Sequence, residues 1–467
     1  MKKIGFLKSC WLVFMGNRMS PHEIQSVQTQ RLKDLIAYAR ERSPYFRDLY
    51  KNLGENPSYE SLPVTTKSEL MTVFDRWVTD PTITKEKINA FMMDEDNIGR
   101  MFEKKCYANY TSGSTGLQCL VLTDKTTENF LLSLNCLRSF SSSASFIKSI
   151  LKGAKFTSIL APGFYIEHNQ IRSQMLSFPL HKYRTQTIDI ANSTSDIVSQ
   201  LNDFRPSILS TYPSVTALLL PEIKAGRLKI KPDIVIIGGE NSTPQLKEDL
   251  RKTLKCSVYD NYGATECGVL AFECPQGHLH INSDWVILEA VDKNNNPVPP
   301  GVCSDKVLLT NLFNYLQPII RYEMTDRVIM HDTPCKCGTT RPYLSVEGRT
   351  DDTLEFESIS GPVQVVPFNL MPDSDLEGLL RYQLVQKDPN TLEMRLHCVD
   401  DASRENTYIF IRNMILHHLE INQIFNIKVY LSDTLPQLVT KSGKFKSVYK
   451  ERPIHVSVIH NDEESVS

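Results

Sequence analysis

A short stretch rich in glycine and hydroxyl groups carries the strongest sign of chemistry in this sequence. After Tyr110 it reads Thr111, Ser112, Gly113, Ser114, Thr115 and Gly116. Glycine lets the backbone turn tightly and bring its N–H groups against an anion, and Ser and Thr hydroxyls add donors in little space. It is not a Walker loop, because no Lys-Ser or Lys-Thr pair closes it. The stretch indicates a phosphate-binding loop, with an ordinary surface loop as the alternative.

Further polar segments recur along the chain, and each one taken alone also has an ordinary structural interpretation. They are Gly238-Gly239-Glu240, Asn261–Glu266, Arg321–Asp326, Gly348–Asp352 and Lys441–Lys444. Asp326 and Arg349 could form a surface ion pair, Glu266 could cap a helix, and Lys444 could be a solvated lysine. Their combination in this order is what favours a functional interpretation.

A separate group of residues has the side chains that bind zinc. It comprises Cys274, His278, His280, Cys335 and Cys337. Zinc takes four N or S ligands in a tetrahedron, usually from two closely spaced pairs. One residue separates Cys335 from Cys337, which is tighter than the common CxxC spacing. The residues alone therefore leave both a zinc site and unlinked thiols open.

Short apolar runs that alternate with helical segments must position these residues. We expect strands at 157–161, 207–210 and 233–237, a helix at 126–137, and longer strands at 285–291 and 306–311. The alternation predicts an α/β domain with a largely parallel sheet, whose ligands gather at the strand ends. The longer strands predict a β-rich subdomain.

The two ends of the chain predict a helical cap and a small separate domain. Near the N-terminus, Val27, Leu32, Leu35, Ile36 and Ala39 share one helical face, and this helix should end at Ser43-Pro44. Near the C-terminus, a strand at 392–399, a helix at 408–419 and a strand at 427–431 predict an α+β fold. We therefore divide the chain into domains 1–349 and 350–467.

Length and composition exclude several classes of protein. A chain of 467 residues with 41% hydrophobic and 23% charged residues should fold into at least two globular domains. A net charge of -2 argues against nucleic-acid binding, and eleven cysteines without paired spacing argue against a disulfide framework. Residues 4–15 faintly resemble a signal peptide, but Lys8 interrupts them and no cleavage site is clear. We expect a cytoplasmic protein without a membrane span.

Taken in order, the glycine-rich loop and the five later segments resemble the motifs of the adenylate-forming enzymes, which include acyl-CoA synthetases, luciferases and peptide-synthetase adenylation domains. Within that superfamily the chain is similar to the phenylacetate–CoA ligase group. The similarity rests on Arg42–Phe46, Ile319–Tyr322 and Pro334–Gly338, and extends over roughly residues 25 to 450. The resemblance departs at Leu117-Gln118-Cys119, where many relatives have a proline, and at Met324-Thr325, where a glycine often precedes the aspartate.

The resemblance implies a large adenylation domain of mixed sheets and helices, with a β-rich subdomain, and a small mobile C-terminal domain. It also implies ATP- and Mg²⁺-dependent activation of an aryl or arylacetic acid as an acyl-adenylate, followed by transfer to a thiol, with coenzyme A as the expected acceptor. Amine, hydroxyl and carrier-protein acceptors stay open. A non-catalytic nucleotide- or zinc-binding protein is the alternative of another class, and a homodimer is left open.

Residue roles follow from the same resemblance. It implies that the phosphates are bound by Thr111, Ser112, Gly113, Ser114, Thr115 and Gly116. Adenine would be bound by Gly239, Glu240 and Tyr262, and the ribose by Asp326 with Arg349. Thr265 would bind the α-phosphate. Glu266 would bind Mg²⁺, Lys444 would act in catalysis, and Asp351 would be the hinge. The acid pocket would draw on Phe164, Tyr165, Tyr212, Pro213, Asn261, Gly263 and Ala264, whose aromatic members could equally be core. A structural zinc would take Cys274, His280, Cys335 and Cys337.

Overall fold

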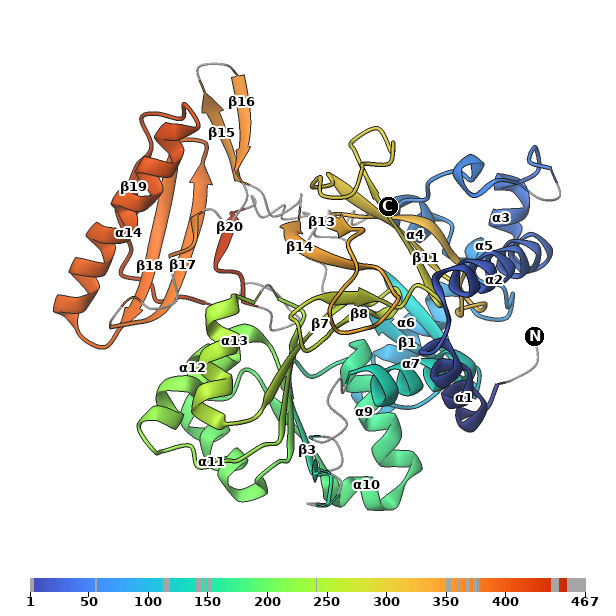
Figure 1. Cartoon of the computed structure of the whole chain (residues 1–467), viewed down its shortest axis with the longest axis horizontal. Coiled ribbons are helices and arrows are strands. Elements are labelled where there is room, and N and C mark those ends of the chain that lie inside the picture. Colours follow the sequence, from blue (N-terminus) through green and yellow to red (C-terminus); the bar gives the residue numbers. More distant parts are fainter. Residues whose placement is uncertain are drawn as a thin grey trace, which may run out of the picture. The chain divides into compact units, whose positions relative to one another are not determined.

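The computed structural model describes residues 4–54, 57–111, 118–139, 145, 148–149, 151, 153–240, 242–349, 354–358, 361–365, 370–372, 376, 378–437 and 445–451. These residues form two compact units (Figure 1). The first comes from residues 1–351 and 437–446, and the second from residues 352–436 and 447–467. The functional domain boundary after residue 349 stays a prediction.

The first unit is built on a nine-stranded mixed sheet with the strand order β13-β14-β9-β8-β7-β6-β5-β3-β4. Its strands are β3 (Phe156–Leu160), β4 (Thr185–Asp189), β5 (Ile208–Thr211), β6 (Ile234–Gly238), β7 (Ser257–Ala264), β8 (Gly268–Glu273), β9 (Leu279–Ile281), β13 (Asp326–His331) and β14 (Tyr343–Arg349). Neighbours from β4 to β7 are parallel, as predicted, and those from β7 to β13 are antiparallel.

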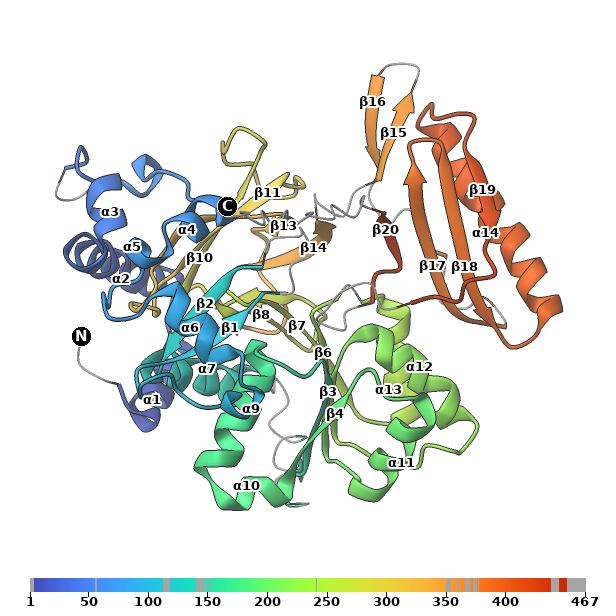
Figure 2. The same ribbon diagram turned by 180° about the vertical axis from the view of Figure 1, so that it is seen from behind.

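Helices cover both sides of the parallel half, because parallel strands need crossover connections. Helices α11 (Thr194–Phe204), α12 (Pro213–Lys224) and α13 (Pro244–Leu254) lie on one side of β3, and α9 (Ile166–Ser177) and α10 (Pro179–Arg184) on the other (Figures 1 and 2). The three-helix side buries an apolar core that includes Ile159, Leu209, Leu219 and Val235.

Two smaller sheets and the N-terminal helices complete the first unit. The helices are α1 (Phe6–Gly16), α2 (Pro21–Arg42), α3 (Pro44–Leu49), α4 (Lys67–Thr72), α5 (Phe74–Trp77), α6 (Lys85–Met92) and α7 (Lys125–Arg138). Strand β1 (Cys106–Tyr110) pairs with β2 (Leu120–Asp124), and β10 (Val286–Val291), β11 (Lys306–Asn311) and β12 (Ile319–Met324) form the predicted β-rich part. One core that includes Phe46, Trp77, Leu120, Val307 and Ile320 runs through all of them.

The second unit has a four-stranded sheet of order β19-β18-β17-β20, a two-stranded sheet and one long helix. The elements are β15 (Leu354–Ser358), β16 (Gly361–Val365), β17 (Leu379–Asp388), β18 (Thr391–Cys398), α14 (Asp401–Ile421), β19 (Lys428–Leu431) and β20 (Val448–Lys450). Helix α14 begins earlier than predicted, because the Asp400 side chain caps it by accepting from the Ser403 N–H. Among the helices that the structure describes, none has both the length and the apolar character to cross a bilayer.

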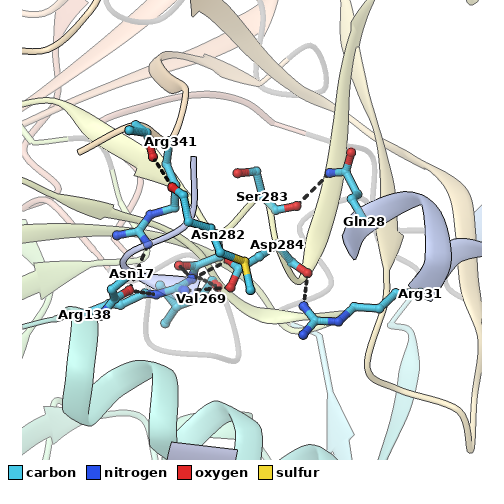
Figure 3. Close-up of polar contacts among 11 residues, drawn as sticks. Asn17, Gln28, Arg31, Arg138, Val269, Asn282, Ser283, Asp284 and Arg341 are labelled. Carbon is cyan, nitrogen blue, oxygen red and sulfur yellow. Dashed lines mark hydrogen bonds and ion pairs between the residues drawn. The ribbon is translucent and has the colours of Figure 1, made fainter. Parts of the chain in front are cut away.

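A buried ion pair joins the N-terminal segment to the sheets of the first unit. The Arg138 and Asp284 side chains lie 2.8 Å apart and are 2% and 1% exposed (Figure 3). Arg138 also donates to the side-chain oxygens of Asn17, at 2.9 Å, and Asn282, at 2.8 Å. Burial by itself would raise the pKa of Asp284, but the charge and hydrogen bonds of Arg138 outweigh it and hold the pKa below its ordinary value. The pair is a fixed point where α7 meets the loop before β10.

Replacing one partner should reveal how strongly this unit depends on the pair. Arg138→Met leaves a buried carboxylate without its partner, so the free energy of unfolding should fall by about 3–5 kcal/mol. Urea denaturation followed by tryptophan fluorescence would measure it, because the buried Trp285 is the neighbour of Asp284. The control is Arg76→Met, which removes the exposed Arg76–Asp48 pair and should change stability by at most about 1 kcal/mol. Equal losses in both variants would contradict the assignment.

Candidate active site

Four predicted nucleotide-site residues come together from segments far apart in the sequence. Tyr262 lies in β7, Glu266 in the turn after it, and Asp326 opens β13 directly across from Arg349, which ends β14. Burial raises the pKa of the Tyr262 phenol well above its ordinary value, with Asp326 and Glu266 adding to the rise and Arg349 opposing it. All three charges therefore act on one buried hydroxyl.

Two polar atoms of β7 are buried without a hydrogen-bond partner in the described part of the chain. They are the Tyr262 hydroxyl and the Asn261 side-chain oxygen. Such a group is unfavourable unless something completes its hydrogen bonds, so the Tyr262 hydroxyl fits a position next to a polar ligand such as a nucleotide. Gly238 of β6 packs beside them, since a β-carbon there would lie 2.9 Å from the Asn261 carbonyl oxygen. Gly239 follows with φ +77°, a conformation that favours glycine.

Glu266 is held by a tyrosine that sequence reasoning had noted only as a family resemblance. The Tyr322 hydroxyl donates to Glu266 Oε1 at 2.9 Å, and the Asn311 side-chain amide donates to the Glu266 carbonyl oxygen at 3.2 Å. Tyr322 is buried in β12. The signal that could have found it is its place in the same short motif as Asp326, Arg321–Asp326. One carboxylate oxygen of Glu266 is thereby oriented.

The two ends of the glycine-rich loop are pinned near this carboxylate. The Cys119 N–H donates to Thr111 Oγ1 at 2.8 Å, and the Thr111 N–H donates to the Cys119 carbonyl oxygen at 2.9 Å. Burial raises the pKa of the Cys119 thiol to about 12, and Glu266 adds to the rise, so the thiol is neutral. The predicted phosphate residues Ser112, Gly113, Ser114, Thr115 and Gly116 lie outside the described residues, as do Lys444 and Asp351.

Glu240, predicted at the adenine, has its carboxylate engaged elsewhere. It accepts from the Ser214 N–H at 3.0 Å and the Ser214 hydroxyl at 3.1 Å, at the start of α12. It also accepts from the Phe445 N–H at 2.9 Å. A negative charge is favourable at a helix N-terminus. An adenine contact by Glu240 stays a prediction, and the structure adds this capping role.

The predicted acid-pocket residues divide between core and partly buried positions. Phe164 packs in the core with its ring centroid 6.3 Å from that of Phe91. Tyr165 and Tyr212 are partly buried, and burial, with Glu167 and Glu240 adding to it, raises the pKa of Tyr212.

At the other end of the predicted pocket, Gly263 has no room for a side chain, because a β-carbon would lie 2.8 Å from the Gly268 carbonyl oxygen. Ala264 packs partly buried against the core. Sequence reasoning missed Glu167, which accepts from the hydroxyls of Ser158 in β3, at 2.7 Å, and Ser210 in β5, at 3.0 Å. A pocket role for Phe164, Tyr165, Tyr212, Gly263 and Ala264 stays a prediction.

The residues predicted as zinc ligands lie together in the first unit. One donor atom from each of Cys274, His280, Cys335 and Cys337 lies within 4.8 Å of the others. Cys274 Sγ is 3.7 Å from Cys335 Sγ, and His280 Nε2 is 3.4 Å from Cys337 Sγ. Cys274 directly follows β8, His280 lies in β9, and Cys335 and Cys337 lie in the connection from β13 to β14.

Surrounding groups orient this cluster as a metal site requires. The His280 Nδ1–H donates to the Arg341 carbonyl oxygen at 2.8 Å, which directs the Nε2 lone pair toward the thiols. The Gln276 N–H donates to Cys274 Sγ, and the Cys337 N–H donates to Cys335 Sγ, both at 3.4 Å. Three sulfurs and one imidazole suit tetrahedral zinc.

His278 lies outside this group of four, although it is close to it. Its ring stacks on Tyr343 with centroids 4.3 Å apart, and its Nδ1 is 3.1 Å from Cys335 Sγ.

Comparison with known families now decides the kind of protein. The sequence profile described as "AMP-binding enzyme" matches residues 64–302, slightly more than half of the chain. The chain belongs to the AMP-binding enzyme family. The predicted membership of the adenylate-forming superfamily is confirmed, and so is the prediction that the protein is an enzyme.

Curated relatives of this AMP-binding enzyme are distant but cover most of its length. A phenylacetate–coenzyme A ligase of Thermus thermophilus is 23% identical over 79% of this chain and 80% of that protein. The protein CapK of Staphylococcus aureus is 20% identical over 84% of this chain and 85% of its own. Phenylacetate–CoA ligases recur among the relatives, so the resemblance to that group is confirmed at low identity.

The fold is also similar to that of solved adenylate-forming enzymes. A 2-hydroxyisobutyryl-CoA ligase in complex with 2-HIB-AMP aligns over 93% of this chain and 91% of its own, with a TM-score of 0.66 at 16% identity. Identity this low speaks for the fold alone. It confirms the predicted α/β fold class.

Proposed function

We propose that this AMP-binding enzyme is an ATP- and Mg²⁺-dependent acid–thiol ligase. The carboxylate of an acid attacks the α-phosphorus of ATP, the acyl–phosphate bond forms, and pyrophosphate leaves. The thiol of coenzyme A then attacks the acyl carbon, and AMP leaves as the thioester forms. The observation that carries the proposal is the convergence of Glu266, Asp326 and Arg349 on the buried hydroxyl of Tyr262, which has no hydrogen-bond partner among the described residues.

Each residue of this constellation has a role that its chemistry supports. Asp326 accepts from the ribose hydroxyls, and Arg349 lies across the β13–β14 ladder from it. Tyr262 and Gly239 line the adenine, and Thr265 donates to the α-phosphate. The loop from Thr111 to Gly116 cradles the other phosphates.

Glu266 fits a magnesium ligand, since it offers hard oxygen atoms beside the predicted phosphate site. Tyr322 engages its Oε1 at 2.9 Å and so orients the carboxylate. Bound Mg²⁺ would offset phosphate charge in the transition state. The acid is proposed to be aryl or arylacetic, with Tyr165 and Tyr212 among the pocket walls.

Adenylation should depend on the charge of Glu266. Glu266→Gln keeps the shape but weakens metal binding, so acid-dependent exchange of pyrophosphate into ATP should fall about 10²-fold or more. A panel of carboxylic acids, with arylacetic and benzoic acids first, would identify the substrate used in the assay. Glu323→Gln is the matched control. Glu323 follows Tyr322 in β12, but its carboxylate pairs with Lys306. Near wild-type exchange in Glu266→Gln would remove this residue from the metal site.

The two half-reactions should separate at Lys444 and Asp351. We propose that Lys444 orients the carboxylate and α-phosphate only during adenylation, worth about 3–4 kcal/mol, and that Asp351 is the pivot between the two steps. Lys444→Ala should lose pyrophosphate exchange yet convert supplied acyl-adenylate to thioester. Asp351→Pro stiffens φ and should keep exchange but lose thioester formation. If both variants lose both steps equally, or Lys444→Ala adenylates normally, the proposal is wrong.

We also propose that Cys274, His280, Cys335 and Cys337 bind one structural zinc. The donor set supports this, because three thiolates and one imidazole fill a tetrahedron and leave no position for a reacting water. Zinc would therefore supply cross-linking rather than catalysis. It would tie β8 and β9 to the connection between β13 and β14.

Metal analysis tests the zinc proposal. Purified protein should contain about one zinc per chain, and Cys335→Ser/Cys337→Ser should lose it together with thermal stability. His280→Ala should lose the metal, while His278→Ala should keep it, since His278 lies outside the group of four. Cys398→Ser in the second unit is the thiol control and should leave zinc content unchanged. The proposal would be contradicted if the purified wild-type protein contained no zinc and if treatment with a chelator left its melting temperature unchanged.

A further inference from the structure

Helix α1 packs on the first unit through its small residues. Its buried positions are Ser9, Val13 and Gly16. The Ser9 hydroxyl lies 2.8 Å from that of Ser133 in α7, and a β-carbon at Gly16 would collide with the Asp284 carboxylate. The helix is therefore seated closely on α7 and the buried ion pair, and its orientation about its own axis is set.

That orientation turns the large apolar residues of α1 toward solvent. Leu7, Trp11 and Phe14 are 83%, 58% and 42% exposed. Their spacing of four and three residues places them in one stripe along the helix. Leaving such side chains in water is unfavourable, and a surface helix normally faces its apolar stripe toward the core. This stripe is thus suited to being covered by something outside the unit.

The charged residues around the stripe are all basic. Residues 1–22 contain Lys2, Lys3, Lys8 and Arg18, and no Asp or Glu, although the whole chain has a net charge of -2. Lys8 and Arg18 are exposed. The Arg18 guanidinium lies 4.3 Å from the centroid of the Phe14 ring, so positive charge borders the stripe directly.

We propose that α1 is an in-plane anchor that binds this enzyme to an anionic bilayer surface. Leu7, Trp11 and Phe14 enter the boundary between headgroups and acyl chains, and Lys8 and Arg18 meet the lipid phosphates. A helix with aromatic and leucine side chains on one face and basic residues beside it has the pattern of interfacial helices. Its 11 residues span about 16 Å, too short to cross a hydrocarbon core of about 30 Å.

A second copy of the chain fits the stripe less well than a bilayer does. A twofold interface places the same patch of both subunits together. That would oppose two wholly basic segments and leave their charges without partners. Anionic lipid complements the apolar stripe and the positive charge at once.

Vesicle binding by the full-length chain tests the proposal, and Trp11 is a built-in reporter. The chain has three tryptophans, of which Trp77 and Trp285 are buried. Vesicles of phosphatidylcholine with about 30% phosphatidylserine should shift the Trp11 emission to the blue and carry the protein in flotation. Vesicles of phosphatidylcholine alone should bind more weakly, and added salt should weaken binding to the anionic ones.

Two variants separate the stripe from the charge, and a third is the control. Leu7→Gln/Phe14→Gln keeps the reporter and should lower vesicle binding about tenfold or more. Lys8→Gln/Arg18→Gln should remove the preference for anionic lipid. Phe410→Gln/Ile421→Gln changes two exposed apolar residues of α14 and should bind like the wild type. Unchanged pyrophosphate exchange in all three would show that the fold is intact.

Several results would overturn the proposal. One is wild-type protein that fails to bind anionic vesicles. Another is vesicle binding that survives Leu7→Gln/Phe14→Gln while Phe410→Gln/Ile421→Gln reduces it. A third is sedimentation that shows a dimer dissociated by Leu7→Gln/Phe14→Gln without any vesicle binding, because a second copy would then cover the stripe.

Discussion

The register of the antiparallel strands β9, β14 and β13 is the constraint on which both sites of the first unit depend. His280 pairs with Phe272 of β8 on one side and Tyr343 of β14 on the other. The same ladder sets Asp326 opposite Arg349 at its far end. A slip of one residue would turn every side chain to the opposite face. It would separate Asp326 from Arg349, the pair proposed to bind the ribose, and at the same time it would disperse the Cys/His cluster.

The Cys/His cluster lies on the same ladder, which fits the structural role proposed for it. The connection from β13 to β14 carries Cys335, Cys337 and Arg341, and closing it with metal would hold the ladder in register. Arg341 also helps to hold this connection in place. Its carbonyl oxygen orients His280, and its guanidinium shares Asn17 with Arg138. Burial, with the nearby Arg138 adding to it, lowers the pKa of Arg341 to about 9.

The buried pair of Arg138 and Asp284 extends the same framework to the N-terminal segment. Because Asn17 directly follows α1, the network that supports the sheet also holds the end of that helix (Figure 3). Close packing at Gly16 then sets which face of α1 points outward. The exposure of Leu7 and Trp11 is thus a consequence of how α1 packs on the core. A helix that was not packed in this way would have no fixed outer face.

The sequence by itself determined the kind of protein and most of the elements. The order of the glycine-rich loop, Glu266, Asp326 and Arg349 identified the superfamily, because each segment carries its own local chemistry. Helix and strand periodicity located α7, β5, β6, β10 and β11 within a residue or two, since both signals are local. The donor types and short spacings of the Cys/His cluster were equally visible.

Only the tertiary structure decided which distant groups meet. It brought the Tyr322 hydroxyl to Glu266 and engaged Glu240 at the start of α12. Within the described part of the chain, it left the buried Tyr262 hydroxyl without a hydrogen-bond partner. It extended the parallel sheet with four antiparallel strands, and it turned the apolar stripe of α1 outward. Periodicity could not show this, because it tells which face of an element is apolar and not what lies against that face. Strand order, register and close packing between segments far apart in the sequence supply that answer.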